Sequence, residues 1–218
     1  MMQPASLPER LRACYSGAIH DVLRAKGHSK QTLPHHIRPL NLSHKLAGPV
    51  FTIEGRRDDS LDPHQSLLKW CELLSRAPSN VVLICQPNDH SLAHMGELSS
   101  ETLTYKKVLG YIVEGGCRDS AFIERLGFAV FCSYFTPADI VGKWAATAFA
   151  QPIKIGDVTI HSGDYVLADR DGIVIIPQSL VEEVTAEAEE VLRKENLVRK
   201  AILQGVDPVA AYLQYGKF

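Results

Sequence analysis

The stretch Gly96-Glu-Leu-Ser-Ser-Glu-Thr-Leu103, with its continuation Gly110-Tyr-Ile-Val-Glu-Gly-Gly-Cys-Arg-Asp119, decides which fold the chain is expected to adopt. A helix over about 97–108 would rise roughly 18 Å at 1.5 Å per residue. The strand that follows, 110–114, would return about 16 Å at 3.3 Å per residue. Gly96 and Arg118 are therefore expected at the same edge of a sheet, where strands end and helices begin.

Strands and helices alternate on both sides of this stretch. Apolar residues at helical spacing predict helices, and short apolar runs bounded by turn residues predict strands. The expected helices cover 7–26, 64–76 and 119–126, and the expected strands cover 48–54, 81–85 and 128–133. This alternation is typical of βαβ units and predicts an α/β protein with a parallel or mixed sheet.

The pattern changes after Pro152. Short β-type runs are separated by Gly-Asp and Asp-Gly pairs that predict hairpin turns, and they cover 153–155, 158–160, 165–167 and 173–176. From Ser179 to Gly205 apolar residues repeat along one face of a long helix, and Ser179 with Glu182 has capping-box spacing. We expect a single domain over 1–218, with 178–218 as a C-terminal helical extension.

The composition excludes several classes of protein. Of 218 residues 45% are apolar and 22% charged, which suffices for a full core and excludes a disordered or collagen-like chain. Lys and Arg number 23 against 25 Asp and Glu, so we expect neither nucleic-acid nor membrane partners. The five Cys form no CxxC pair, and no apolar leader or membrane-length run is present, which indicates a reducing, cytoplasmic compartment.

The sheet edge carries groups suited to an anion and a metal ion. Backbone N–H groups of Gly96, Glu97, Leu98 and Ser99 would point outward from a helix N-terminus and bind a carboxylate or phosphate. Arg118 can add a bidentate contact, and Asp119 offers an oxygen ligand suited to Mg²⁺. The alternative is that Arg118 and Asp119 only cap a helix and form a surface ion pair.

Several ordered motifs resemble those of the RraA-like family, which includes the ribonuclease E regulator proteins and the 4-hydroxy-4-methyl-2-oxoglutarate (HMG) aldolases. The resemblance runs along nearly the whole chain, through 19–23, 48–52, 96–119, 128–131, 163–177, 195–199 and 215–218. It implies a swivelling β/β/α architecture assembled as a homotrimer or a hexamer. Family aldolases have an acidic residue, twenty intervening residues and Arg-Asp, and Glu97 keeps that spacing to Arg118-Asp119.

The resemblance also implies roles for these residues. Gly96, Glu97, Leu98 and Ser99 would hold the substrate carboxylate, Arg118 would contact the keto or enolate oxygen, and Asp119 would anchor Mg²⁺ or Mn²⁺. Glu97 would orient metal-bound water, although the family aldolases usually have Asp there and its longer arm could shift that water. Glu114 likewise stands where Asp is common.

The resulting hypothesis is a divalent-metal-dependent lyase. It would cleave HMG-type 4-hydroxy-2-oxo acids to pyruvate and decarboxylate oxaloacetate, both through a pyruvate enolate stabilised by the metal and Arg118. The alternative is a non-catalytic regulator that binds an RNA-degrading enzyme. The carboxylates at 97 and 119 favour the enzyme, because a regulator needs no metal pocket.

Weaker candidates lie outside this stretch. His90 and His94 have i, i+4 spacing but sit in an expected loop without an HExxH pattern, which favours exposed histidines over a zinc site. Cys117 is expected to be small and buried. Others considered were Asp58, Asp59 and His64, which could reach the cleft or a subunit boundary, and Asp21, which has no assigned role. No GxGxG loop supports a nucleotide cofactor.

Overall fold

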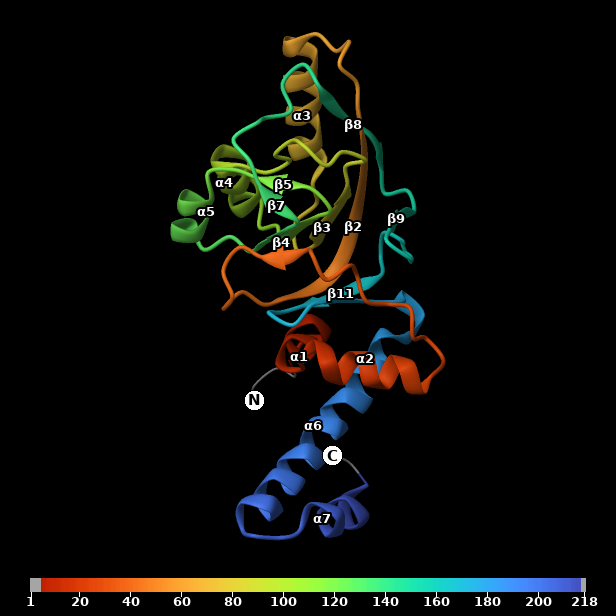
Figure 1. Ribbon diagram of the computed structural model, residues 1–218. Helices are drawn as coiled ribbons and strands as arrows, with labels where there is room; N and C mark the ends of the chain where they lie inside the picture. The colour runs from red at the N-terminus through yellow and green to blue at the C-terminus, as the bar shows by residue number, and fades with distance from the viewer. Residues whose placement is uncertain (1–4, 217–218) are drawn as a thin grey trace.

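The computed structural model describes residues 5–216 and is built around a curled eight-stranded sheet (Figure 1). Seven of its strands follow the order β1-β6-β4-β3-β2-β11-β12, and β8 pairs with β2. Their bounds are Arg38–Pro39 for β1, Leu46–Arg57 for β2, Val82–Gln86 for β3, Gly110–Val113 for β4, Val130–Cys132 for β6, Trp144–Phe149 for β8, Tyr165–Ala168 for β11 and Ile173–Ile176 for β12. The long strand β2 therefore joins two parts of the sheet.

The centre of the sheet is parallel and its flanks are antiparallel. Strands β2, β3, β4 and β6 run in the same direction, with Val50 opposite Val82 and Val82 opposite Gly110. Strands β1, β8, β11 and β12 pair antiparallel to their neighbours. The prediction of an α/β protein with a mixed sheet is confirmed, whereas β8 was not predicted.

Three helices cover one face of the parallel strands (Figure 1). They are α3 (Pro63–Arg76), α4 (Glu97–Tyr105) and α5 (Ser120–Leu126). Their buried residues Leu73, Leu103 and Ile123 pack with sheet residues such as Leu83 and Val113. Each helix follows a parallel strand, so the N-termini of α4 and α5 lie at the edge where the preceding strands end.

The opposite face of the sheet packs against β structure. The hairpin β9 (Ile153–Ile155) and β10 (Val158–Ile160) shares a core with Ile84, Ile112 and Phe131. Strands β11 and β12 contribute to the same core, because the sheet curls back over itself. Together with the helical layer this gives the expected β/β/α arrangement.

A separate layer of helices packs on the outer side of β11 and β12. It contains α1 (Leu7–Ala13), α2 (Ser16–Ala25) and the first part of α6 (Val181–Leu203). The single helix expected over 7–26 is wrong, because the backbone is extended at Cys14 and Tyr15. Ser16 starts α2 by donating its N–H and hydroxyl to the Asp169 carboxylate at 2.8 and 2.7 Å.

The C-terminal segment forms two helices. Helix α6 extends beyond the body of the molecule, and α7 (Pro208–Tyr215) folds back against its end around Ala211 (Figure 1). The expected Ser179 capping box is absent, because a 3₁₀ turn over Gln178–Leu180 precedes α6 and Leu180 is its N-cap. Residues 1–4 and 217–218 of the expected domain lie outside the described residues.

Within residues 5–216, every helix is too short or too polar to cross a lipid bilayer. All five cysteines are free. Cys117 is buried, as expected.

Candidate functional site

The segment before α4 runs alongside the segment before α5. Ala93 forms a parallel bridge with Gly116, and His94 donates its N–H to the Gly116 carbonyl at 2.8 Å. The Arg118 N–H then bonds the Met95 carbonyl at 2.9 Å. This ladder places the N-terminus of α4 directly beside Arg118, which confirms that Gly96 and Arg118 share one edge of the sheet.

Glycine is required at position 96 because the contact leaves no space for a side chain. A Cβ at Gly96 would lie 2.8 Å from Oδ2 of Asp119 and 3.3 Å from Cγ of Arg118. The backbone at Gly96 is extended, with φ −152°, so its conformation would suit any residue. Gly96 therefore allows the N-terminus of α4 to approach Arg118 and Asp119 closely, and it is not needed for an unusual backbone turn.

Asp119 turns its carboxylate toward α4. Its Oδ2 accepts a hydrogen bond from the Glu97 N–H at 3.1 Å and lies 3.5 Å from Nε of Arg118. Asp119 is the N-cap residue of α5, yet its side chain makes no cap bond there. Its φ of 55° is in the left-handed region, which is costly for a residue other than glycine and is often found at functional sites.

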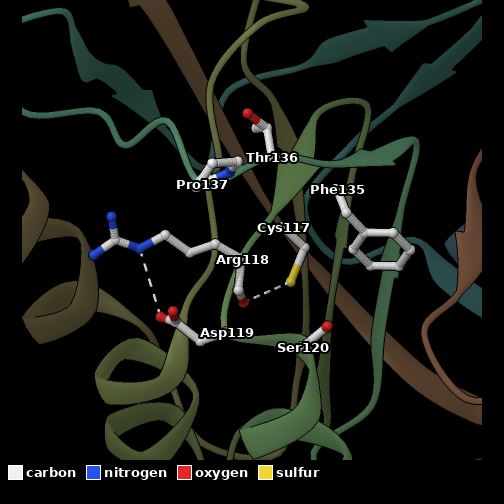
Figure 2. A pocket seen from close by; sticks show the side chains of 7 residues that line it. All are labelled: Cys117, Arg118, Asp119, Ser120, Phe135, Thr136 and Pro137. Carbon is white, nitrogen blue, oxygen red and sulfur yellow. Dashed lines mark hydrogen bonds and ion pairs between the residues drawn. The ribbon is translucent and has the colours of Figure 1, made fainter.

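Arg118 and Asp119 line a cleft of about 570 Å³ (Figure 2). Cys117, Ser120, Phe135, Thr136 and Pro137 also line it. The Arg118 side chain is 39% exposed and that of Asp119 37%, so both can reach a ligand from solvent. The surface ion pair of the alternative hypothesis is thus present, but it lies in a cleft.

A second carboxylate, which the sequence did not indicate, also holds Arg118. Asp139 Oδ2 accepts a hydrogen bond from Nη1 of Arg118 at 3.2 Å, and Asp139 Oδ1 accepts the Val141 N–H. The guanidinium is therefore held between Asp119 and Asp139. Asp139 belongs to a loop after β7 (Tyr134–Phe135), a strand that pairs with β5 (Gly116–Cys117), and no local spacing links residue 139 to residue 118.

The remaining residues of the predicted cradle take different positions. The Leu98 side chain is 77% exposed and touches no core, so its backbone is what a ligand would meet. The Ser99 hydroxyl accepts a hydrogen bond from Nε1 of Trp70 at 2.9 Å, which ties the first turn of α4 to α3. Ser100 N–H bonds the Gly96 carbonyl and closes that turn.

Glu97 lines a different hollow from Arg118. Its side chain faces a cavity of about 240 Å³ between α4 and α5, together with Glu101, Phe122 and Arg125. Its backbone N–H, in contrast, belongs to the Asp119 contact. The backbone contribution of Glu97 to the site therefore has a structural basis, whereas the water-orienting role of its carboxylate stays a prediction.

The donor set around Asp119 fits a hard divalent cation. Asp119 lines the cleft and its Oδ1 has no hydrogen-bond partner among residues 5–216, whereas the Asp139 carboxylate is bonded to Nη1 of Arg118. Mg²⁺ keeps several waters and is commonly held by one or two carboxylates. Within the described chain, no three His, Cys, Asp or Glu side chains gather as a metal cage.

Other sequence candidates lie away from the cleft. His94 is fully buried and His90 exposed, so the expectation that both are exposed is wrong for His94. Both ring nitrogens of His94 lack a hydrogen-bond partner, and its ring meets Trp144 edge to face. Three of the rest contact residues nearby in sequence, namely Asp58 with Ser60, Asp59 with Arg57 and Asp21 with Arg24. Glu114 lies 3.7 Å from the distant His36, and His64 is exposed in α3.

The fold and cleft together define a class of protein. The family model described as "RraA-like: Aldolase/RraA" matches residues 16–175. The chain belongs to this family. The match ends before α6, so the C-terminal helices lie outside the matched region.

Individual proteins of known sequence or structure are similar to this chain. The chain is 28% identical over 178 residues to a Halalkalibacterium halodurans protein named "Putative 4-hydroxy-4-methyl-2-oxoglutarate aldolase", covering 82% of this chain and 81% of that one. A structure described as one of "novel cellulases from microbes associated with the gut ecosystem" superposes with a TM-score of 0.83 at 30% identity, covering 90% and 89%. Streptomyces coelicolor RraAS2, described as an unusual member of the RNase ES inhibitor RraA family, superposes at 0.78 with 24% identity, covering 91% and 98%.

Proposed function

We propose that this protein is a divalent-metal-dependent lyase that cleaves HMG-type 4-hydroxy-2-oxo acids to pyruvate and decarboxylates oxaloacetate. One observation carries the proposal: beside Gly96, the Asp119 carboxylate bonds the N–H at the start of α4 at 3.1 Å and lies 3.5 Å from Nε of Arg118. A carboxylate receptor, a cation for a developing oxyanion and an oxygen ligand are the three groups that this chemistry needs.

The substrate carboxylate is received by α4. The first N–H groups of a helix have no partner inside it, and the Glu97 N–H is engaged by Asp119. The N–H groups of Leu98 and Ser99 remain for a ligand, with the positive end of the helix dipole behind them. Gly96 keeps this end of the helix open to close approach.

Arg118 provides the charge for the reacting oxygen. Both reactions leave an electron pair on the carbon next to the keto group, so negative charge moves onto the keto oxygen as the enolate forms. Asp139 and Asp119 hold the guanidinium beside α4 before the substrate arrives, and such preorganised charge stabilises a transition state with little rearrangement. A Mg²⁺ or Mn²⁺ ion held by Asp119 would supply additional positive charge at the same oxygen.

The same proposal includes assembly as a homotrimer or hexamer. Asp119 fills only part of the ligand positions of a divalent cation, and water or a neighbouring subunit can supply the others. Light scattering after size-exclusion chromatography tests this point. The expected mass is three or six times the 24.1 kDa chain mass, and a monomer would contradict it.

Pyruvate release tests the activity. Purified protein is given oxaloacetate or HMG with Mg²⁺, Mn²⁺ or EDTA, and pyruvate is followed through lactate dehydrogenase. Because oxaloacetate loses CO₂ slowly in solution with metal ions, the rate without protein is subtracted in every arm. The expected result is turnover of at least one substrate that requires the metal ion.

Two variants make this test specific. Arg118→Ala removes the cation of the cleft, and Arg170→Ala removes an exposed arginine outside it. We expect Arg118→Ala to lose activity and Arg170→Ala to retain it. If the unaltered protein shows no metal-dependent rate above Arg118→Ala, the enzyme is excluded and a protein-binding role is favoured.

A further inference from the structure

A second cavity lies at the opposite end of α4. It holds about 300 Å³ and is formed by α1, the segment before β2, and the turns after α4 and α5. Its lining includes Arg12, His44, Lys45, Leu46, Val108 and Phe128. Thr104 of α4 also lines it, and that residue stands about 10 Å along the helix from Glu97 at 1.5 Å per residue. The cavity is therefore separate from the Arg118 cleft.

Two cations at this cavity have no acidic partner. Among residues 5–216, the side chains of Arg12 and Lys45 make neither a hydrogen bond nor an ion pair. Other basic residues near the same helices are paired, since Arg10 binds Glu189 at 2.6 Å and Lys26 binds Glu183 at 2.6 Å. Lys45 is half-buried despite its charge. Arg12 and Lys45 thus place positive charge at the cavity that no ion pair with a described carboxylate neutralises.

His44 adds an unsatisfied polar atom. Its Nδ1 is buried and has no hydrogen-bond partner, although the side chain lines the cavity. Buried polar atoms in folded proteins are nearly always bonded to protein, water or a ligand. Burial lowers the pKa of His44, while Glu124 on α5 acts in the opposite direction. Nδ1 can then serve a bound molecule.

Several backbone carbonyls at the helix ends beside the cavity are already hydrogen-bonded. Helices α4 and α5 both end here, and free carbonyls at helix ends would repel negative charge. The Leu103 and Thr104 carbonyls are bonded by the N–H groups of Val108 and Lys107, and the Ile123 and Glu124 carbonyls by the Gly127 N–H. The remaining walls are apolar, including Leu109 and Leu126.

We propose that this cavity binds a small organic anion, with a phosphate or carboxylate head on Arg12, Lys45 and His44 and a short apolar chain against Val108, Leu109 and Phe128. Guanidinium and ammonium groups bind both kinds of head through charge-assisted hydrogen bonds. A volume of about 300 Å³ is at the small end of the range for ligand pockets. The site is independent of the proposed lyase activity.

Isothermal titration calorimetry with butyl phosphate, butyrate and inorganic phosphate tests the proposal. We expect saturable binding of butyl phosphate or butyrate, and binding of inorganic phosphate at least tenfold weaker than that of butyl phosphate. The first two ligands distinguish a phosphate head from a carboxylate head. Equal affinity for butyl phosphate and inorganic phosphate would overturn the apolar part of the site.

Three variants locate the binding. The double variant Arg12→Gln, Lys45→Gln is expected to weaken affinity at least tenfold while keeping the melting temperature and pyruvate release of the unaltered protein. Lys30→Gln, Arg170→Gln removes the same net charge from exposed positions elsewhere and should bind normally. Arg118→Ala should also bind normally. Loss of binding in Arg118→Ala, or unchanged binding in the first double variant, would overturn the proposal.

Discussion

The carboxylate of Asp119 accepts a hydrogen bond from the backbone N–H of Glu97 at 3.1 Å, across two helices that start at the same edge of the sheet. One contact thus joins the proposed metal ligand to the proposed carboxylate receptor. Any change in the charge or position of Asp119 is transmitted to the N-terminus of α4. The predictions below separate these electrostatic and steric contributions.

Replacing Asp119 by Asn should separate charge from hydrogen bonding. The amide oxygen can still accept the Glu97 N–H, so the free energy of unfolding should change by about 1 kcal/mol or less. The negative charge needed to hold a divalent cation is lost, so metal-dependent pyruvate release should fall about 100-fold or more. Urea unfolding and the coupled assay measure the two effects; full activity in the Asp119→Asn variant would contradict the metal role.

Gly96→Ala should impair the cleft with little effect on backbone conformation. The new Cβ would stand 2.8 Å from Asp119 Oδ2, so the carboxylate or α4 must shift by several tenths of an ångström. We expect pyruvate release to fall at least tenfold, because small displacements of catalytic groups cost rate. Gly172→Ala is the matched control, since its Cβ would meet nothing within 4 Å. An equal loss in both variants would argue against a specific contact.

Glu97→Asp tests the acidic side chain alone. The substitution keeps the backbone N–H that binds Asp119 and shortens a carboxylate that faces the cavity between α4 and α5. Activity should be retained or should rise, because Asp is the residue usual in the resembling aldolases. Steady-state kcat and KM are measured for both proteins, and complete loss of turnover in the variant would contradict the water-positioning role.

Because of His94, we expect the free energy of unfolding to be lower in mild acid than at neutral pH. Burial lowers the pKa of His94 to about 4, opposed by the nearby Asp89 carboxylate, whereas in the unfolded chain the value is about 6.5. The pKa of His94 is lower in the folded protein than in the unfolded chain. The contribution of His94 to the free energy of unfolding is therefore complete above pH 6.5 and is lost as pH falls toward 4. The loss over this window should reach about 3 kcal/mol.

Urea unfolding between pH 4.5 and 7.5 checks the His94 prediction. His94→Gln should flatten the dependence of unfolding free energy on pH across this window. His90→Gln provides the control, because His90 lies in the same loop but is exposed. A slope that is unchanged in His94→Gln would assign the acid sensitivity to other groups.

Local pattern predicted most elements because hydrophobic periodicity and turn residues act over short distances. The helix at 64–76 differs from observed α3 by one residue, and the strand at 81–85 differs from β3 by one residue at each end. The strand β8 escaped prediction because its sequence, Trp-Ala-Ala-Thr-Ala-Phe, has small residues in place of an apolar alternation. It is held by pairing with β2, a contact made far away in the sequence.

In the candidate site, too, local spacing predicted some contacts and contacts between distant segments escaped prediction. The twenty residues between Glu97 and Arg118, together with one helix and one strand, sufficed to place Gly96 beside Arg118. Asp139 reaches Arg118 only because β5 and β7 pair. The helix expected over 7–26 is interrupted where Ser16 bonds Asp169, a residue 153 positions further along the chain. Such contacts depend on where separate segments meet in space and leave no local trace in sequence.

The sequence by itself determined the α/β class and the grouping of Gly96, Arg118 and Asp119, since these follow from spacing along adjacent elements, and its motifs resembled those of the family. Only the tertiary structure decided the second carboxylate on Arg118, the burial of His94, the position of Glu97 at the cavity between α4 and α5, and the cavity at Arg12 and Lys45. Those features arise from packing between distant segments, where the burial and partners of each side chain are set by its neighbours in space.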